Sequence, residues 1–520
     1  MDRSEFLKGS ALGAAGIGLL GTVGMGSAIA RADEAPFDME TGVVVVGAGN
    51  GGLSAAAALV GLGRPVVLLE VSAQLGGGAI WSGGVLHSGN VGSFDAYCER
   101  SYNNAVNAGN LALEQAYVET FVGSYIPWLQ EIGIPLTDVG VEAGVPRWTF
   151  GDPDNEGSMY ERAQTYFDAL AAYIEENGGT IMPSTRAVSL ITDDAKVAGV
   201  FAENVLDGST LRIKADDVVL ACGGLQANKG LLAQFMGKGA LSSHNMGTPY
   251  NTGSGLLMAV AAGAKMAGNP TGFSGGYCLA CPPGIDEYDA LSYEAHRAEG
   301  FSFDQGKTVY GSWVNLYSAT GAPGGIDTFF FNLEGRRFAD ENDGVVNRYS
   351  ILPQKVMQQP GGVAVIVMDA EAYGDGALPW DIAVEVGIKT VTADTLEEFA
   401  QGLHDAYGMP KGTFLREVTA YNEAFANDAT DMLDVPRSDC NRAFEMGPFY
   451  ALPIACSIYY TFAGLDINEN AQVMRLDGRP FPNLYACPPT AAMFSEVYFG
   501  GNAVAGTFGY IAAHHIAAKG

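Results

Sequence analysis

The segment from Thr41 to Glu70 constrains the fold of this chain more than any other part of the sequence. A β-branched run at 43–46 predicts a buried strand, and an alanine-rich helix follows it. Three glycines in G-x-G-x-x-G spacing stand where the strand meets the helix: Gly47, Gly49 and Gly52. A second strand is predicted at 65–69, directly before Glu70. Such glycines let a pyrophosphate approach the helix N-terminus, and such a carboxylate binds a ribose hydroxyl. The segment therefore predicts a Rossmann-like dinucleotide site rather than a merely tight turn.

The composition is that of an ordinary globular protein with room for more than one domain. The 520 residues are 48% hydrophobic and 17% charged. Asp and Glu number 58 against 28 Lys and Arg, which gives a formal net charge of -30. Because this charge repels polyanions, we expect no nucleic-acid partner and no binding to anionic membrane surfaces. The seven cysteines and six histidines show no metal-site spacing, so no metal is expected.

The first 32 residues predict an export signal. Arg3 and Lys8 precede an uncharged stretch at 9–30 and an Ala-Arg-Ala sequence ending at Ala32, where cleavage is expected. The mature protein is then expected outside the cytoplasmic membrane, in the periplasm or cell envelope. The start resembles a twin-arginine signal, although Ser4 replaces the second arginine. If the segment is not cleaved, it is the only expected membrane contact, and its many glycines make it a weak anchor.

Further glycine-rich segments favour a flavin over a nicotinamide as the dinucleotide. Residues 74–89 form a second glycine-rich loop, and a buried strand predicted within 215–228 ends in a third. Together with 251–264 and 335–342, these segments resemble the flavoproteins of the fumarate reductase and 3-ketosteroid dehydrogenase family. The resemblance covers roughly Thr41 to the C-terminus and implies noncovalently bound FAD. The residues expected to bind it are Gly47, Gly49, Gly51, Gly52, Glu70, Gly77, Gly78, Ser82, Gly83, Gly84, Ala221, Gly223, Gly224, Gly253, Gly501, Asn502 and Ala503.

The same resemblance implies the domain organisation. We expect an α/β fold in which a Rossmann-like FAD-binding domain carries an inserted α+β capping domain. The FAD-binding domain is expected at 41–268 and 459–520, and the cap at 269–458. Within the cap, 392–426 is predicted to be helical, with Thr392 opening the helix and acidic residues in its first turn.

One tyrosine and the glycine-rich turn after it are the first catalytic candidates. In fumarate reductases an arginine shortly before this turn binds a substrate carboxylate, and alignment on 500–503 puts Tyr498 at that position. The 3-ketosteroid dehydrogenases resemble this chain in having tyrosine there, and in them the backbone amide four residues later, here that of Asn502, helps to bind a ketone oxygen. The resemblance implies that Tyr498 and the Asn502 amide polarise a substrate carbonyl.

A neighbouring segment argues against a dianionic substrate. Tyr459 and Tyr460 stand where the dicarboxylate reductases carry two histidines, and we count Tyr460 among the catalytic candidates. Without that arginine and a histidine, a dianion has little charge compensation in a site that excludes water. A neutral, flatter substrate is therefore expected, such as a steroid-like or polyphenol-like enone.

The proton donor is expected after the R-F-x-x-E segment that ends at Glu341. The family places the donor four residues later, which here is Val345, and valine carries no exchangeable proton on its side chain. A short insertion makes Arg348 or Tyr349 the candidate, and a solvated surface position is the alternative interpretation for both.

The sequence thus predicts an exported FAD-dependent oxidoreductase that reduces or forms a carbon–carbon double bond next to a carbonyl. A separate redox protein or small carrier is expected to supply or remove electrons, because no haem-attachment or covalent-flavin motif is apparent. One alternative is a reductase of an unsaturated carboxylate, with Arg336, Arg337 or Arg348 as the anion clamp. The other is a flavin-carrying electron-transfer protein without its own substrate.

Overall fold

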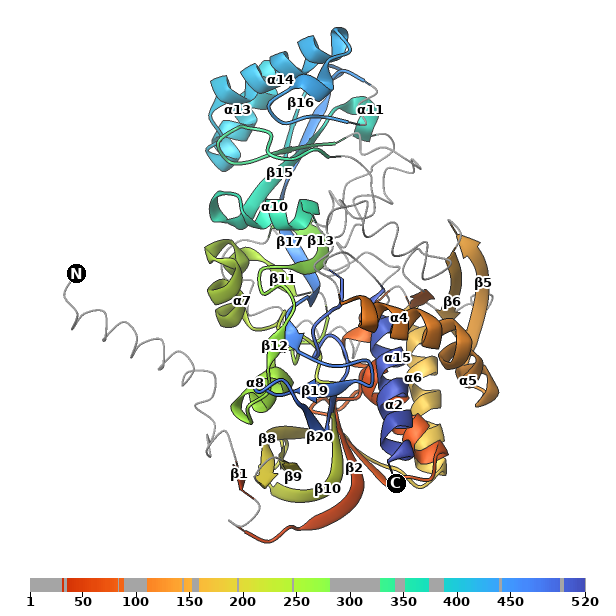
Figure 1. Cartoon of the computed structure of the whole chain (residues 1–520). Coiled ribbons are helices and arrows are strands. Elements are labelled where there is room, and N and C mark those ends of the chain that lie inside the picture. The colour runs from red at the N-terminus through yellow and green to blue at the C-terminus, as the bar shows by residue number, and fades with distance from the viewer. Residues whose placement is uncertain are drawn as a thin grey trace, which may run out of the picture.

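The computed structural model describes residues 30–31, 35–82, 84–87, 110–142, 145–151, 159–193, 196–245, 247–280, 328–341, 351–373, 388–438, 442–495 and 500–519. These residues form two groups of elements, one toward each end of the view in Figure 1. The first group combines early and late parts of the chain, and the second is built from its middle.

The first group is built on a nine-stranded sheet. Its strands are β1 (Ala30–Arg31), β2 (Met39–Val46), β3 (Val66–Leu69), β7 (Thr180–Met182), β8 (Thr185–Asp193), β9 (Lys196–Asn204), β10 (Thr210–Leu220), β19 (Gln472–Met474) and β20 (Pro480–Ala486). Strands β7, β3, β2, β10 and β20 are paired in that order and are all parallel. Parallel pairs need crossover connections, and the sheet has the mixed α/β character of a Rossmann-like domain. The predicted fold class is confirmed.

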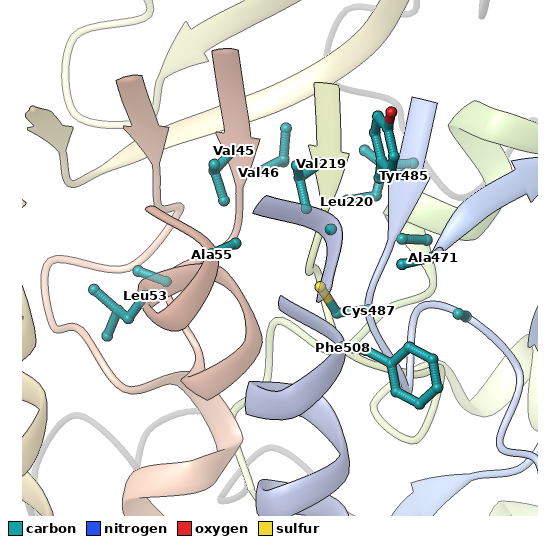
Figure 2. Packing of buried hydrophobic residues seen from close by; sticks show 14 of the residues in the cluster. Val45, Val46, Leu53, Ala55, Val219, Leu220, Ala471, Tyr485, Cys487 and Phe508 are labelled. Carbon is teal, nitrogen blue, oxygen red and sulfur yellow. The ribbon is translucent and has the colours of Figure 1, made fainter. Parts of the chain in front are cut away.

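Helices α2 (Asn50–Gly61), α6 (Met159–Glu176) and α15 (Gly501–Ala518) pack beside this sheet (Figure 1). Figure 2 shows Leu53 of α2 and Phe508 of α15 in one buried cluster with Val219 of β10. Helices α2 and α15 approach closely because glycines line the contact. A Cβ atom on Gly509 would lie only 2.2 Å from the Gly51 carbonyl oxygen. The first and last parts of the chain are thus locked together by helix packing.

A small sheet and three short helical segments lie near α15. The sheet contains β4 (Val85–His87), β5 (Leu136–Glu142) and β6 (Val145–Phe150), with β6 in the middle. The helical segments are α4 (Leu111–Thr120), the π-helical η2 (Phe121–Tyr125) and α5 (Ile126–Glu131). Other short elements of this group are η1 (Gly77–Trp81), α7 (Lys229–Met236), η3 (Lys238–Ser242), α8 (Ser254–Ala261), β12 (Met266–Ala267) and β18 (Gly464–Leu465).

The second group is a six-stranded sheet with helices. Its long central strand is β17 (Phe449–Thr461), and the others are β11 (His244–Asn245), β13 (Phe273–Leu279), β14 (Phe329–Phe331), β15 (Val363–Met368) and β16 (Val391–Ala393). Helical segments of this part of the chain are α10 (Leu352–Met357), η6 (Pro360–Gly362), α11 (Ala370–Tyr373), α13 (Leu396–Tyr407), α14 (Lys411–Ala426) and η7 (Thr430–Met432). Strand β17 crosses the predicted boundary at 458, and the domain boundaries stay predictions.

The predicted helical stretch at 392–426 needs a correction. Thr392 lies in β16, where it pairs with Tyr450 of β17. The helix begins later, because Thr395 is the N-cap of α13 and its hydroxyl accepts a hydrogen bond from the Glu398 amide. Gly408 then ends α13 in a left-handed conformation, so two helices replace one.

Within the described ranges, no helix is long and apolar enough to cross a membrane. The predicted export signal falls almost entirely outside those ranges.

Candidate active site

Three loops leave the parallel sheet at the same level. Val46 of β2 and Ala486 of β20 are both register partners of Leu220 in β10. The loops that follow begin with Gly47, Ala221 and Cys487, so they start at one edge of the sheet. In open α/β sheets, ligands bind outside the carboxyl ends of the strands. This edge is the candidate site.

The first glycine loop, residues 47–52, fits a dinucleotide pyrophosphate. A Cβ atom on Gly52 would lie 1.8 Å from the Gly47 carbonyl oxygen, so only glycine allows the turn to close. A Cβ atom on Gly49 would meet nothing nearer than the Gly76 oxygen at 4.0 Å, which leaves open space on that side. Helix α2 begins there without a side-chain cap and without an acidic residue in its first turn. Its amide groups are available to an anion.

Gly51 lies against the loop after β20 and against helix α15. A Cβ atom on it would lie 3.0 Å from Cys487 Cβ and 3.1 Å from the Ala505 oxygen. A glycine is therefore required here for helix and loop packing, and its contact with FAD stays a prediction.

The Glu70 carboxylate joins the first loop to the residues just after β3, which precede the second loop at 76–84. It is buried, and its two oxygens accept hydrogen bonds from the amides of Ala48 (2.7 Å) and Ser72 (2.8 Å). Burial raises the pKa of Glu70, and the hydrogen bonds from these amides act in the opposite direction. The carboxylate thus fixes loop geometry, and its contact with a ribose remains a prediction.

The second loop runs beside the first. The Gly76 amide donates to the Ala48 oxygen at 2.8 Å, and a Cβ atom on Gly77 would lie 3.2 Å from Gly49 Cα. Ser82 then connects to the last helix, because its hydroxyl oxygen accepts a hydrogen bond from Asn502 Nδ2 at 2.6 Å.

The remaining predicted positions of the second loop lie around it. A Cβ atom on Gly78 would lie 3.2 Å from Asn251 Nδ2, and Gly84, at φ +67°, lies against Phe150. Gly83 lies outside the described residues.

The third loop, residues 221–224, follows β10 at the same edge of the sheet. A Cβ atom on Gly223 would lie 2.1 Å from Asn251 Oδ1, and one on Gly224 would lie 2.7 Å from Thr461 Oγ1. The amide of Gly253, which precedes α8, donates to the Gly224 oxygen at 3.0 Å. Asn251 therefore lies between the second and third loops, a position that the sequence analysis missed.

The turn at residues 500–503, called here the α15 turn, brings the catalytic candidates into the site. A Cβ atom on Gly501 would lie 2.9 Å from Tyr460 Cε1. One on Gly500 would lie 2.9 Å from His87 Cε1 and 3.0 Å from its Nε2. The two glycines are therefore required because two rings, those of Tyr460 and His87, lie against the turn. Asn502 is half-buried, and Ala503 is buried in the helix.

His87 is a site residue that the sequence analysis did not identify. It is buried at the end of β4, and its register partner in the neighbouring strand β6 is Arg147. Burial, helped by the charge of Arg147, lowers the pKa of His87 to about 4. The imidazole beside the α15 turn is therefore neutral at physiological pH.

Three catalytic candidates, Tyr498, Arg348 and Tyr349, lie outside the described residues, and their roles stay predictions.

Two of the arginines proposed as anion clamps lie within the described residues. Arg337 is buried and bound to Glu341 at 2.5 Å, and it donates to the carbonyl of Val435. Arg336 is exposed. Arg337 is thus a structural ion-pair partner within the second group of elements. In the described part of the chain no cluster of three metal-ligating side chains occurs.

The family model described as an FAD binding domain matches residues 42–504. The chain belongs to this FAD-binding family. The predicted cofactor FAD and the predicted family resemblance are confirmed, and noncovalent attachment stays a prediction.

Several named proteins are similar to this chain over most of its length. A probable fumarate reductase of Shewanella frigidimarina is 25% identical over 92% of this chain and 75% of that protein. A vinyl phenol reductase of Lactiplantibacillus plantarum is 24% identical over 90% of this chain and 93% of that protein. An NADH:acrylate oxidoreductase of Vibrio harveyi is 25% identical over 90% of this chain, which spans only 49% of that longer protein. The relatives are oxidoreductases by name, and the prediction of an FAD-dependent oxidoreductase is confirmed at that level.

A solved structure shows the same fold. The 3-ketosteroid Δ1-dehydrogenase of Sterolibacterium denitrificans superposes with a TM-score of 0.70 at 19% identity, over 92% of this chain and all of that one.

Proposed function

We propose that this flavoprotein reduces, or in reverse forms, a carbon–carbon double bond next to a carbonyl in a neutral enone. The observation that carries the proposal is the α15 turn. Helix α15 follows the N-cap residue Gly500, with no side-chain cap and no acidic residue in its first turn. The groups shown against it, Tyr460, neutral His87 and the hydroxyl of Ser82, carry no charge. A carbonyl oxygen that gains negative charge fits such a turn.

The chain's own residues supply orientation and hydrogen bonds in this proposal. Bound FAD supplies the two-electron chemistry. The Asn502 amide donates to the substrate oxygen, and Tyr498, two residues before Gly500 in sequence, donates through its phenol. Arg348 or Tyr349 delivers the proton to the carbon next to the carbonyl.

The test is Tyr498→Phe. Loss of one oxyanion donor is expected to lower kcat on the enone about 10²- to 10³-fold while FAD binding is kept. Tyr421→Phe is the matched control, because its hydroxyl donates to the Arg442 carbonyl (2.9 Å) in the second group of elements. That variant is expected to keep the wild-type kcat. Equal kcat in wild type and Tyr498→Phe would refute the role of the phenol.

An unsaturated carboxylate is the second candidate substrate, because two of the relatives carry the names of carboxylate-reducing enzymes. In that case Tyr498→Arg is expected to raise the rate on fumarate, since a guanidinium binds a carboxylate through two hydrogen bonds.

We also propose that the protein is exported and exchanges electrons with a separate redox protein or small carrier. Cleavage after Ala32 would remove β1, which pairs with β8 at the margin of the sheet through Ala30 and Arg31. Only two residues of the sheet are lost, so the parallel core does not depend on the signal.

A further inference from the structure

A buried hydrogen-bond network joins the first turns of α2 and α15. Asn50 Nδ2 donates to the Asn502 carbonyl oxygen at 2.8 Å, and it lies 3.4 Å from the Tyr125 hydroxyl. On its other side, Asn50 Oδ1 accepts a hydrogen bond from the Tyr166 hydroxyl at 3.2 Å. The Tyr125 hydroxyl shares a further hydrogen bond of 2.9 Å with Ser54. The network thus connects helices α2, α6 and α15 with η2.

The network is removed from solvent. Asn50 is 2% exposed, and Ser54, Tyr125 and Tyr166 are fully buried. Burial raises the pKa of both tyrosines, so both keep their protons. Buried polar groups are costly unless each finds a partner, and here the four side chains are partners of one another.

Packing alone does not require these polar groups. The Asn50 position is a variable one within the G-x-G-x-x-G motif, where an alanine would serve the helix equally well. The opposite helix makes room for them: a Cβ atom on Gly506 would lie 2.1 Å from the Tyr125 hydroxyl and 2.6 Å from Asn50 Nδ2. Helix α15 therefore has a glycine, Gly506, at the point where the network lies against it.

Asn502 is held on two sides. Its carbonyl accepts from Asn50, and its side chain donates to Ser82 Oγ at 2.6 Å. One residue of the α15 turn is thereby tied to the first and second glycine loops at once.

We propose that Asn50 is a positioning residue that, with Tyr166 behind it, fixes Asn502 in the α15 turn and thereby sets the direction in which the amides of the turn, that of Asn502 among them, face the substrate carbonyl. The carbonyl-binding role of the Asn502 amide rests on the function proposed above. The restraint that Asn50 places on the α15 turn does not depend on that function, because it follows from the hydrogen bonds described above.

Amide hydrogen exchange of the FAD-loaded protein tests directly whether Asn50 restrains the α15 turn. Asn50→Ala removes the contact, and Tyr166→Phe frees Asn50 Oδ1 without touching Asn502. Both variants are expected to speed exchange in peptides covering 500–504 about three- to tenfold, the effect of losing one net hydrogen bond. Thr395→Ala is the matched control, because it removes one helix N-cap hydrogen bond in α13. It is expected to speed exchange only in α13. Unchanged exchange at 500–504 in both test variants would overturn the inference, whatever the substrate is.

Steady-state kinetics on the enone test the second half of the inference. Both variants are expected to lower kcat about three- to tenfold with little change in KM, because a misoriented donor affects the transition state. In the double variant the two losses are expected not to add, since Tyr166 acts through Asn50. Faster exchange with unchanged kcat would overturn the positioning role. Faster exchange in a protein that reduces no enone at all would leave the restraint in place and refute the proposed function instead.

Discussion

Glu70 offers a quantitative test of how the cofactor site is held together. Its carboxylate accepts one hydrogen bond from the Ala48 amide and one from the Ser72 amide, at 2.7 and 2.8 Å. In Glu70→Gln only one side-chain oxygen remains, and the new NH₂ group must face one of the two amide donors. The variant therefore loses one of the two hydrogen bonds, turns the other into a weaker bond to a neutral oxygen, and leaves a buried amide donor without a partner.

The magnitude follows from these contacts. A hydrogen bond to a charged group contributes about 1.5–3 kcal/mol. Burial of the charge, which raises the pKa of Glu70, offsets part of that contribution. We expect the free energy of unfolding of the FAD-free protein to fall by about 1–2 kcal/mol. FAD affinity is expected to fall about tenfold or more, because the first loop and the residues after β3 no longer hold one geometry and the predicted ribose contact loses its charged acceptor.

Urea unfolding and a fluorescence titration with FAD measure the two quantities. Glu40→Gln is the control, because Glu40 lies in β2 and makes an exposed ion pair with Lys214 at 3.3 Å. Exposed pairs of this kind contribute little, so the control is expected to match wild type in both assays. If Glu70→Gln also matched wild type, Glu70 would not hold the first loop in the way proposed here.

Three further predictions concern other parts of the molecule. Because the folded-state pKa of His87 lies near 4, below its ordinary value of 6.5, the unfolded chain takes up a proton first as the pH falls. Wild type is therefore expected to lose up to roughly 3 kcal/mol of unfolding free energy relative to His87→Asn between pH 6.5 and 4, measured by urea unfolding; parallel curves would contradict this. Gly52→Ala, whose Cβ would lie 1.8 Å from the Gly47 oxygen, is expected to abolish stoichiometric FAD content, and a fully yellow variant would contradict the turn geometry. Arg3→Gln is expected to leave uncleaved precursor inside the cell, whereas wild type begins near Asp33 by N-terminal sequencing; recovery of Met1 on exported wild-type protein would contradict cleavage.

Local patterns in the sequence were sufficient for the dinucleotide motif. The run at 43–46 lies in β2, the strand predicted at 65–69 is β3, and the glycines between them lie in the predicted turn. These elements are close in sequence, and buried parallel strands have a distinct β-branched composition. The start of α13 was placed wrongly because Thr392 and Thr395 are both suitable N-caps, and only the pairing of Thr392 with Tyr450 decides between them.

The remaining site residues could not be predicted because tertiary contacts alone bring them together. Asn50 and Tyr166 are separated by 116 positions and Asn50 and Asn502 by 452. A single asparagine or histidine in a helix or strand carries no pattern of its own. The glycine at position 500 can be read from the sequence. The reason why a glycine is required there, the His87 ring against the turn, is visible only in the fold.

The central proposal is that the α15 turn holds the carbonyl oxygen of a neutral enone, which bound FAD would reduce. The most direct measurement reduces the purified protein without oxygen and follows return of the oxidised flavin absorbance after mixing with single acceptors. A 3-keto-4-ene steroid and a flavonoid represent neutral enones, and fumarate and a cinnamate-like acid represent carboxylates. We predict rapid reoxidation by at least one neutral enone and slow reoxidation by both carboxylates. Rapid reoxidation by a carboxylate alone would contradict the account, and so would reoxidation by none of the four.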